Sequence, residues 1–346
     1  MMLVPLVVAL AARGESFSRA AALRNIAEKV IAPGYQDFAM QSRALTNAVE
    51  QLANAPDPKS IEQARQAWSA TLLAARRLQG FQAGPLTERE YASSFYYWQV
   101  LPVRIEAVAE SARAIDKRMI DELGATAKGL FALEYLLFDG AAGEPGVDVL
   151  KLLAASDRRR AYMAALARDI EMKASRLADD WSRTDAQGAS AKFVAAGQET
   201  VNVLVNQLAM NIETVAENRM NFVLSLPQPV SRQLHRIEGS RSGTSLDGIL
   251  ATMEGIRTIY KGRDGAGLDD AVRKVNPALQ QRLEQQMDAA IAALRDLKIP
   301  LERAVVEKRD ALESAYQAVR VLEISFKTEL ASALGVTITF NSGDGD

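Results

Sequence analysis

A single carboxylate, Glu134, lies inside an almost continuous run of apolar residues, Gly129–Phe138. A helix that is apolar on every face is normally buried, and a buried carboxylate must take up a proton or pair with a cation. Two interpretations remain open. In one, Glu134 forms a structural ion pair with Arg76, Arg77 or Lys128; in the other, it lines a pocket and binds a ligand or a metal ion.

The composition restricts which metal ion such a site would accept. The chain has no cysteine and one histidine, His235. These counts exclude disulfides, thiolate metal sites, a cysteine nucleophile and a lipidated N-terminal cysteine. Carboxylates would therefore supply most ligands, which favours iron or another hard divalent or trivalent cation over zinc.

Other candidate sites are weaker. His235 and Glu238 share a spacing of three residues, but they lie between Pro229 and Gly239, where a long helix is not expected, so we interpret His235 as a solvated loop residue. The sequence also lacks a phosphate-binding loop, a nucleophile elbow and a His-Glu-x-x-His motif. Nucleotide hydrolysis, acyl transfer and zincin proteolysis therefore lack their usual residues.

Charge and the N-terminal segment indicate where the protein works. Lys and Arg total 41 against 43 Asp and Glu, so no overall field attracts nucleic acid. Residues 1–16 begin with an apolar run that ends in the small-x-small pattern Ala9–Ala11, which is typical of a signal peptide or apolar N-terminal segment. Because no later segment reaches the length of a transmembrane span, we expect an exported protein of the periplasm or cell envelope.

Apolar spacing of three and four residues predicts an all-α protein of about nine helices. Asp57 and its neighbours end the first helix, and Ser60 is the expected cap of the second. Residues 336–340 alternate like a strand but are too short to form a sheet. The expected helices cover residues 17–53, 60–80, 102–123, 125–138, 149–181, 189–223, 246–260, 277–297 and 300–334.

The chain of 346 residues is long for one bundle and predicts two fused helical bundles. The segment 140–146 is rich in Gly and Ala and is the best linker candidate. We therefore expect an N-terminal bundle over residues 17–145 and a C-terminal bundle with a short extended tail over residues 146–346.

Several short motifs resemble the imelysin-like family, whose signature is Gly-x-His-x-x-Glu on such an apolar helix. Gly129 and Glu134 match the signature, and Phe131 stands where the family has histidine. The other matching pieces occur in the expected order and span most of the chain: Ala67-Trp68, Arg76, Phe81–Leu86, Trp98, Pro102, Arg104–Glu106, Ser242–Leu246, Gly255-Ile256, Tyr260 and Phe340–Asp346.

The resemblance implies a two-bundle fold in the bacterial periplasm or outer envelope, a link to iron acquisition and an old classification as a metallopeptidase. It also implies that Glu238 and Arg241, just before Ser245, face the same inter-bundle cleft as Glu134. Arg76 and Trp98 match the family and complete the set of candidate ligand-binding residues.

The departure at Phe131 bears on the activity. In the signature, histidine and glutamate share one helix face and can share an ion, whereas a phenylalanine offers a metal no ligand. We therefore expect a non-catalytic component of iron uptake that binds a small ligand or a metal ion, with Glu134 as the candidate metal ligand. The alternatives are a metallopeptidase of the imelysin type and a scaffold that presents its helices to another envelope protein.

Overall fold

The computed structural model describes residues 18–139 and 148–339, which form helices, turns and loops and no strand. The all-α prediction is confirmed. The expected signal segment, the linker at residues 140–146 and the matching motif at residues 340–346 lie outside the described residues. No helix in the described ranges is long and apolar enough to cross a membrane.

The first half of the chain contains long helices linked by short ones. Its elements are α1 (Arg19–Asn25), η1 (Ile26–Ile31), α2 (Ala32–Asn54), α3 (Pro58–Leu78), α4 (Pro85–Glu88), α5 (Ala92–Tyr96), α6 (Pro102–Glu110), α7 (Lys117–Glu122), η2 (Ala125–Ala127), α8 (Gly129–Glu134), η3 (Tyr135–Asp139), α9 (Val149–Ala155) and α10 (Asp157–Ser182).

The second half is organised in the same way. Its elements are α11 (Ala189–Ala195), α12 (Gln198–Glu213), η4 (Thr214–Asn221), α13 (Phe222–Leu224), η5 (Val230–Arg236), α14 (Ser245–Lys261), α15 (Leu268–Val275), α16 (Pro277–Leu297), α17 (Leu301–Glu307), α18 (Arg309–Ser325), η6 (Phe326–Leu330) and α19 (Ala331–Ala333).

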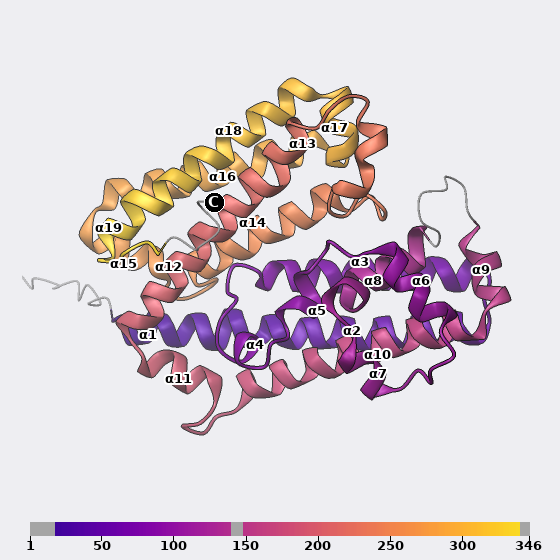
Figure 1. Ribbon diagram of the computed structural model, residues 1–346. Coiled ribbons are helices and arrows are strands. Elements are labelled where there is room, and N and C mark those ends of the chain that lie inside the picture. Colours follow the sequence, from indigo (N-terminus) through magenta and orange to yellow (C-terminus); the bar gives the residue numbers. More distant parts are fainter. Residues whose placement is uncertain (1–17, 140–147, 340–346) are drawn as a thin grey trace, which may run out of the picture.

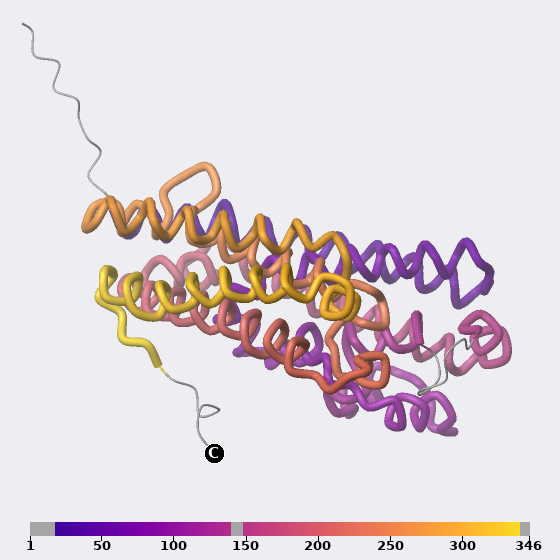
Figure 2. Tube along the Cα trace, turned by 90° about the horizontal axis from the view of Figure 1, so that it is seen from above, coloured from indigo at the N-terminus to yellow at the C-terminus, as the bar shows by residue number. Residues whose placement is uncertain are grey.

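Two layers of roughly parallel helices stack on each other (Figure 1). In the lower layer, α2 packs along both α3 and α10, and α8 packs on α10. In the upper layer, α16 packs on α18 and α14, and α12 contacts α18. The view from above shows the long helices of both layers running along the same axis (Figure 2).

Helices α3 and α14 join the two layers. Gly255 of α14 makes this possible, because a Cβ at this position would lie 2.0 Å from the carbonyl oxygen of Arg77 on α3. Two helix backbones approach this closely only where one of them lacks a side chain. Gly255 was part of the family resemblance, and its role is to let the bundles touch.

The structure divides the chain into more helices than the nine expected. Single loop residues or short loops interrupt five of the predicted helices, at residues 111–116, 128, 156, 196–197 and 308. The region after Gly262, expected to be a loop, contains α15. Residues 336–339 form neither helix nor strand.

The division into residues 17–145 and 146–346 stays a prediction, but the packing favours a later boundary. Helix α10 follows the proposed boundary in sequence, yet it lies along α2 and α8 in the lower layer. The upper layer begins with α12. A boundary near α11 would agree better with these contacts.

Candidate functional site

The position of Glu134 depends on how α8 begins. Gly129 has φ +81°, and a Cβ there would lie 2.3 Å from the carbonyl oxygen of Ser94 in α5. Only glycine adopts this backbone without strain and also permits the close approach. Gly129 therefore seats α8 directly on the α5 backbone and so sets the direction in which Glu134 points.

Glu134 is enclosed between the two layers, with 1% of its surface exposed. The hydroxyl of Ser242 donates a hydrogen bond of 2.6 Å to its Oε1. Within residues 18–139 and 148–339, no cation lies within ion-pair distance of its carboxylate. Of the two interpretations left open, the ion pair with Arg76, Arg77 or Lys128 is not formed among the described residues, and Arg76 pairs with Glu238.

This environment changes the acidity of Glu134. Burial raises its pKa from the ordinary 4.5 to about 7, and the negative charge of Glu238 adds to the increase. The hydrogen bonds from Ser242 and the charge of Arg241 act in the opposite direction. Desolvation penalises the charged form and prevails here, since the carboxylate has no direct cationic partner among the described residues.

Phe131 lies one helical turn before Glu134 and forms an aromatic wall. Its ring lies edge-on to the indole of Trp68, with ring centroids 6.4 Å apart. The guanidinium of Arg76 lies 5.4 Å from the centre of the same ring. A phenylalanine in this place therefore supplies apolar and cation–π contacts rather than a metal ligand.

A buried ion network lies next to this wall. Arg76 is fully buried and pairs with Glu238, and Arg219 holds the other oxygen of Glu238 at 3.1 Å. Arg76 also donates a 2.7 Å hydrogen bond to the side chain of Gln79. Burial lowers the pKa of Arg76 to about 10, partly offset by Glu238. Both oxygens of Glu238 are thus held by arginines.

The remaining candidates have different partners. Arg241 pairs with Asp139 at 3.0 Å. Ser245 donates a 2.6 Å hydrogen bond to Glu302 and accepts one from the backbone of Leu301, so it holds α17. Trp98 is half-buried and makes no hydrogen bond or ring contact with the other candidates among the described residues.

Sequence analysis missed four residues that complete this polar cluster: Ser242, Gln79, Arg219 and Thr252. Thr252 and Arg219 both donate to Gln79, at 3.2 and 3.1 Å. Ser242 was part of a matching motif, but nothing in that motif assigned it to Glu134. Polar residues within otherwise apolar helical stripes were the available signal for Arg219 and Thr252.

These residues do not fit a metal ion. No three Asp, Glu or His side chains converge as ligands in the described ranges. Glu134 offers a single carboxyl group, and Glu238 is already committed to two arginines. Hydroxyl groups and one such acid are a poor donor set for a hard cation.

The cavity described next to the arginine network is small. The cavity beside Glu238, Arg219 and Ser245 has a volume of about 10 Å³. That volume admits about one water molecule. Glu134 does not line this cavity, and the loop 239–244 contacts its carboxyl group through Ser242.

Comparison with known proteins places this arrangement in a family. The sequence profile described as Imelysin matches residues 31–326. The chain is 24% identical over 306 residues to iron-regulated protein A of Synechococcus elongatus, an alignment that covers 83% of this chain and 78% of the relative.

Two solved structures share the fold. An iron-regulated protein A precursor from Parabacteroides distasonis superposes with a TM-score of 0.76 at 17% identity, covering 93% of this chain and 97% of that one. An imelysin-like protein from Psychrobacter arcticum gives 0.73 at 16% identity, covering 94% and 99%. The profile match extends over most of the sequence and both layers of helices, and the chain therefore belongs to the imelysin family.

Proposed function

We propose that this protein is an exported, non-catalytic binding component of iron uptake, and that the polar site around Glu134 holds its ligand. One observation carries the proposal: a carboxyl group is enclosed where the two bundles meet, hydrogen-bonded to Ser242 and without an ion-pair partner in the described residues. A buried acid without a compensating cation costs stability, and such groups concentrate at functional sites.

The loop that contacts Glu134 supports a binding role. Gly239 and Gly243 adopt φ +76° and +70°, and Arg241 and Ser242 lie between them. Movement of this segment would release the hydroxyl, the carboxyl group and one guanidinium together. These groups can recognise a polar ligand through several hydrogen bonds, and closure would exclude water from it.

The donor set argues for binding of a polar molecule or an iron complex rather than of a bare ion. Phe131 removes the imidazole that the family signature would place beside Glu134. A metallopeptidase needs an ion with an open coordination position and a polarised water. Because the residues present do not fit an ion, we infer that the protein is not a peptidase.

The link to iron and the location have separate support. The relative in Synechococcus elongatus carries the name iron-regulated protein A, which motivates iron uptake as the process. The apolar N-terminal run with its small-x-small pattern motivates export.

Calorimetric titration tests the binding role, with ferric citrate and uncomplexed Fe²⁺ as probes. We expect saturable binding of ferric citrate by the wild type and about tenfold weaker binding by Ser242→Ala, as for the loss of one hydrogen bond to a charged group. Ser314→Ala, at an exposed serine of α18, is the matched control. Stoichiometric binding of bare Fe²⁺ would contradict the proposed ligand class.

The peptidase alternative has its own test. Unfolded casein incubated with the wild type and with Glu134→Ala should remain intact in both samples. Cleavage by the wild type that disappears in Glu134→Ala would establish the alternative and refute a non-catalytic role.

A further inference from the structure

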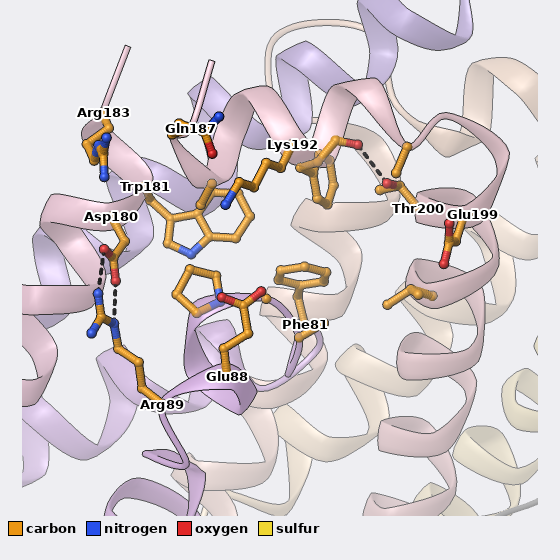
Figure 3. A pocket seen from close by; sticks show the side chains of 17 residues that line it. Phe81, Glu88, Arg89, Asp180, Trp181, Arg183, Gln187, Lys192, Glu199 and Thr200 are labelled. Atoms are coloured by element: carbon orange, nitrogen blue, oxygen red, sulfur yellow. Dashed lines mark hydrogen bonds and ion pairs between the residues drawn. The ribbon is translucent and has the colours of Figure 1, made fainter. Parts of the chain in front are cut away.

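A second cavity, of about 620 Å³, lies between α4, the end of α10, α11 and the start of α12 (Figure 3). None of its lining residues belongs to the network around Glu134. Pockets of roughly 300–1,000 Å³ accept small organic molecules. The proposed function assigns this cavity no role.

The floor of the cavity is a cluster of three aromatic rings. Phe81 and Phe193 each lie edge-on to Trp181 with ring centroids 5.7 Å apart, and they lie 5.4 Å from each other. All three side chains are buried and lie on different segments of the chain. Such mutual packing fixes their orientation and gives the cavity a rigid apolar surface.

The floor also contains an unsatisfied donor. Trp181 is 2% exposed, and its indole N–H has no hydrogen-bond partner among the described residues. A buried N–H without an acceptor is unfavourable, and an acceptor on a bound ligand would remove that cost. In the view of Figure 3, the indole nitrogen lies between the side chains of Lys192 and Glu88.

Lys192 and Glu88 present opposite charges to this space. They extend from opposite walls, Lys192 from α11 and Glu88 from α4 (Figure 3). Neither side chain forms a hydrogen bond or ion pair with any residue that the structure describes. The neighbouring Arg89 differs, because Asp180 holds it with two hydrogen bonds of 2.7 and 2.9 Å.

We propose that this cavity binds a zwitterion with an apolar body, the chemistry of a free hydrophobic amino acid or a dipeptide. The ammonium group pairs with Glu88, the carboxylate pairs with Lys192, and the apolar side chain rests on the aromatic floor. A ligand with only one charge leaves either Glu88 or Lys192 without a partner and gains less binding energy.

Calorimetry with four probes tests the proposal on the whole protein. The probes are L-phenylalanine, phenylalanyl-phenylalanine, 3-phenylpropionate, which lacks the ammonium group, and phenethylamine, which lacks the carboxylate. We expect saturable binding of at least one zwitterion and about tenfold weaker binding of both single-charge analogues, the usual effect of losing one charged contact.

Variants assign the binding to this cavity. Lys192→Gln and Glu88→Gln should each weaken binding of the zwitterion about tenfold, whereas Lys274→Gln, at an exposed lysine of α15, should leave it unchanged. Ala196→Trp places a large side chain on an exposed lining position and should abolish binding with an unchanged melting temperature. Absence of saturable binding by both zwitterions, equal affinity for an analogue with one charge, or binding unaffected by Lys192→Gln and Glu88→Gln would overturn the proposal.

Discussion

The carboxyl group of Glu134 differs from the other acids at the bundle interface. Glu238 and Asp139 each contact at least one arginine, whereas Glu134 contacts the hydroxyl of Ser242. Burial raises its pKa to about 7, so the carboxyl group gains or loses its proton near neutral pH. This group therefore contributes to the pH dependence of the stability of the protein.

The sign of that dependence follows from the pKa of Glu134 in the two states. The folded value, about 7, exceeds the ordinary 4.5 expected of the unfolded chain, so the folded state binds the proton more tightly. The associated stability is complete below pH 4.5 and is lost as pH rises through 7, a total of about 3 kcal/mol. Glu134→Gln, which resembles the protonated acid, should remove this loss.

Urea unfolding at two pH values tests this prediction. Glu134→Gln should match the wild type at pH 5 and exceed its free energy of unfolding at pH 8. Glu110→Gln, at an exposed position of α6, should follow the wild type at both values. Loss of about 3 kcal/mol or more by Glu134→Gln at pH 8 would show instead that the carboxylate is ion-paired.

Removing the charge of Glu238 should destabilise the protein, whereas removing the charge of Glu134 should stabilise it above neutral pH. Glu238→Gln removes the charge that compensates the fully buried Arg76 and the largely buried Arg219. Leaving a buried charge unpaired costs roughly 3–5 kcal/mol. We expect a decrease of this size in the free energy of unfolding at pH 7. A change below about 1 kcal/mol, typical of exposed ion pairs, would show that the network is solvated.

Gly129 offers a test of how the site is positioned. Gly129→Ala introduces both a strained φ of +81° and a methyl group against the backbone of Ser94, so we expect a loss of roughly 3 kcal/mol in stability. Gly124→Ala, where φ is −66° and the nearest contact is ordinary, should change stability by less than about 1 kcal/mol. Equal effects of the two substitutions would contradict the account of how α8 begins.

For single residues, the sequence predicted the burial of Glu134 but not its hydrogen-bond partner. Burial follows from the local apolar run Gly129–Phe138, because a helix that is apolar on every face packs away from solvent. The partner Ser242 lies 108 residues further along the chain. Local spacing contains no information about such a contact, and for the same reason it could not show that Arg76 pairs with Glu238.

Helix ends that depend on a local motif could be predicted from the sequence, whereas interruptions inside a continuous apolar pattern could not. Ser60 was expected to cap α3, and the structure shows that Asp57 is the cap while Ser60 completes a capping box. Both residues belong to one local motif, so the start was nearly correct. The interruptions near Ser156 and Gly197 were not predicted, because apolar spacing continues across each of them.

The crossing of α3 and α14 gives a prediction for these elements. Gly255→Ala would place a methyl group 2.0 Å from the backbone of Arg77, and the bundles would have to separate. We expect a loss of roughly 2–4 kcal/mol in the free energy of unfolding. Gly248→Ala lies on the same helix with no atom near the added methyl group and should be neutral or slightly stabilising. Similar losses in both variants would show that the crossing is not tight.

For the whole molecule, the sequence predicted two bundles, because its length and its number of expected helices exceed those of one bundle. The boundary at residues 145–146 stays a prediction. Helix α10 is amphipathic like its neighbours, and only its packing against α2 and α8 shows to which layer it belongs. The ion network of Arg76, Glu238 and Arg219 joins residues of both halves of the chain, since Arg76 lies on α3 and Arg219 on η4.

Native mass spectrometry tests the central claim most directly. The protein is purified without chelators from the envelope fraction of iron-limited cells, as the wild type and as Ser242→Ala. We predict a noncovalent ligand mass on the wild type that is released on denaturation and is lost or strongly reduced in Ser242→Ala. A wild type that carries no mass beyond its own polypeptide, or a ligand retained equally by Ser242→Ala, would contradict a binding site at Glu134.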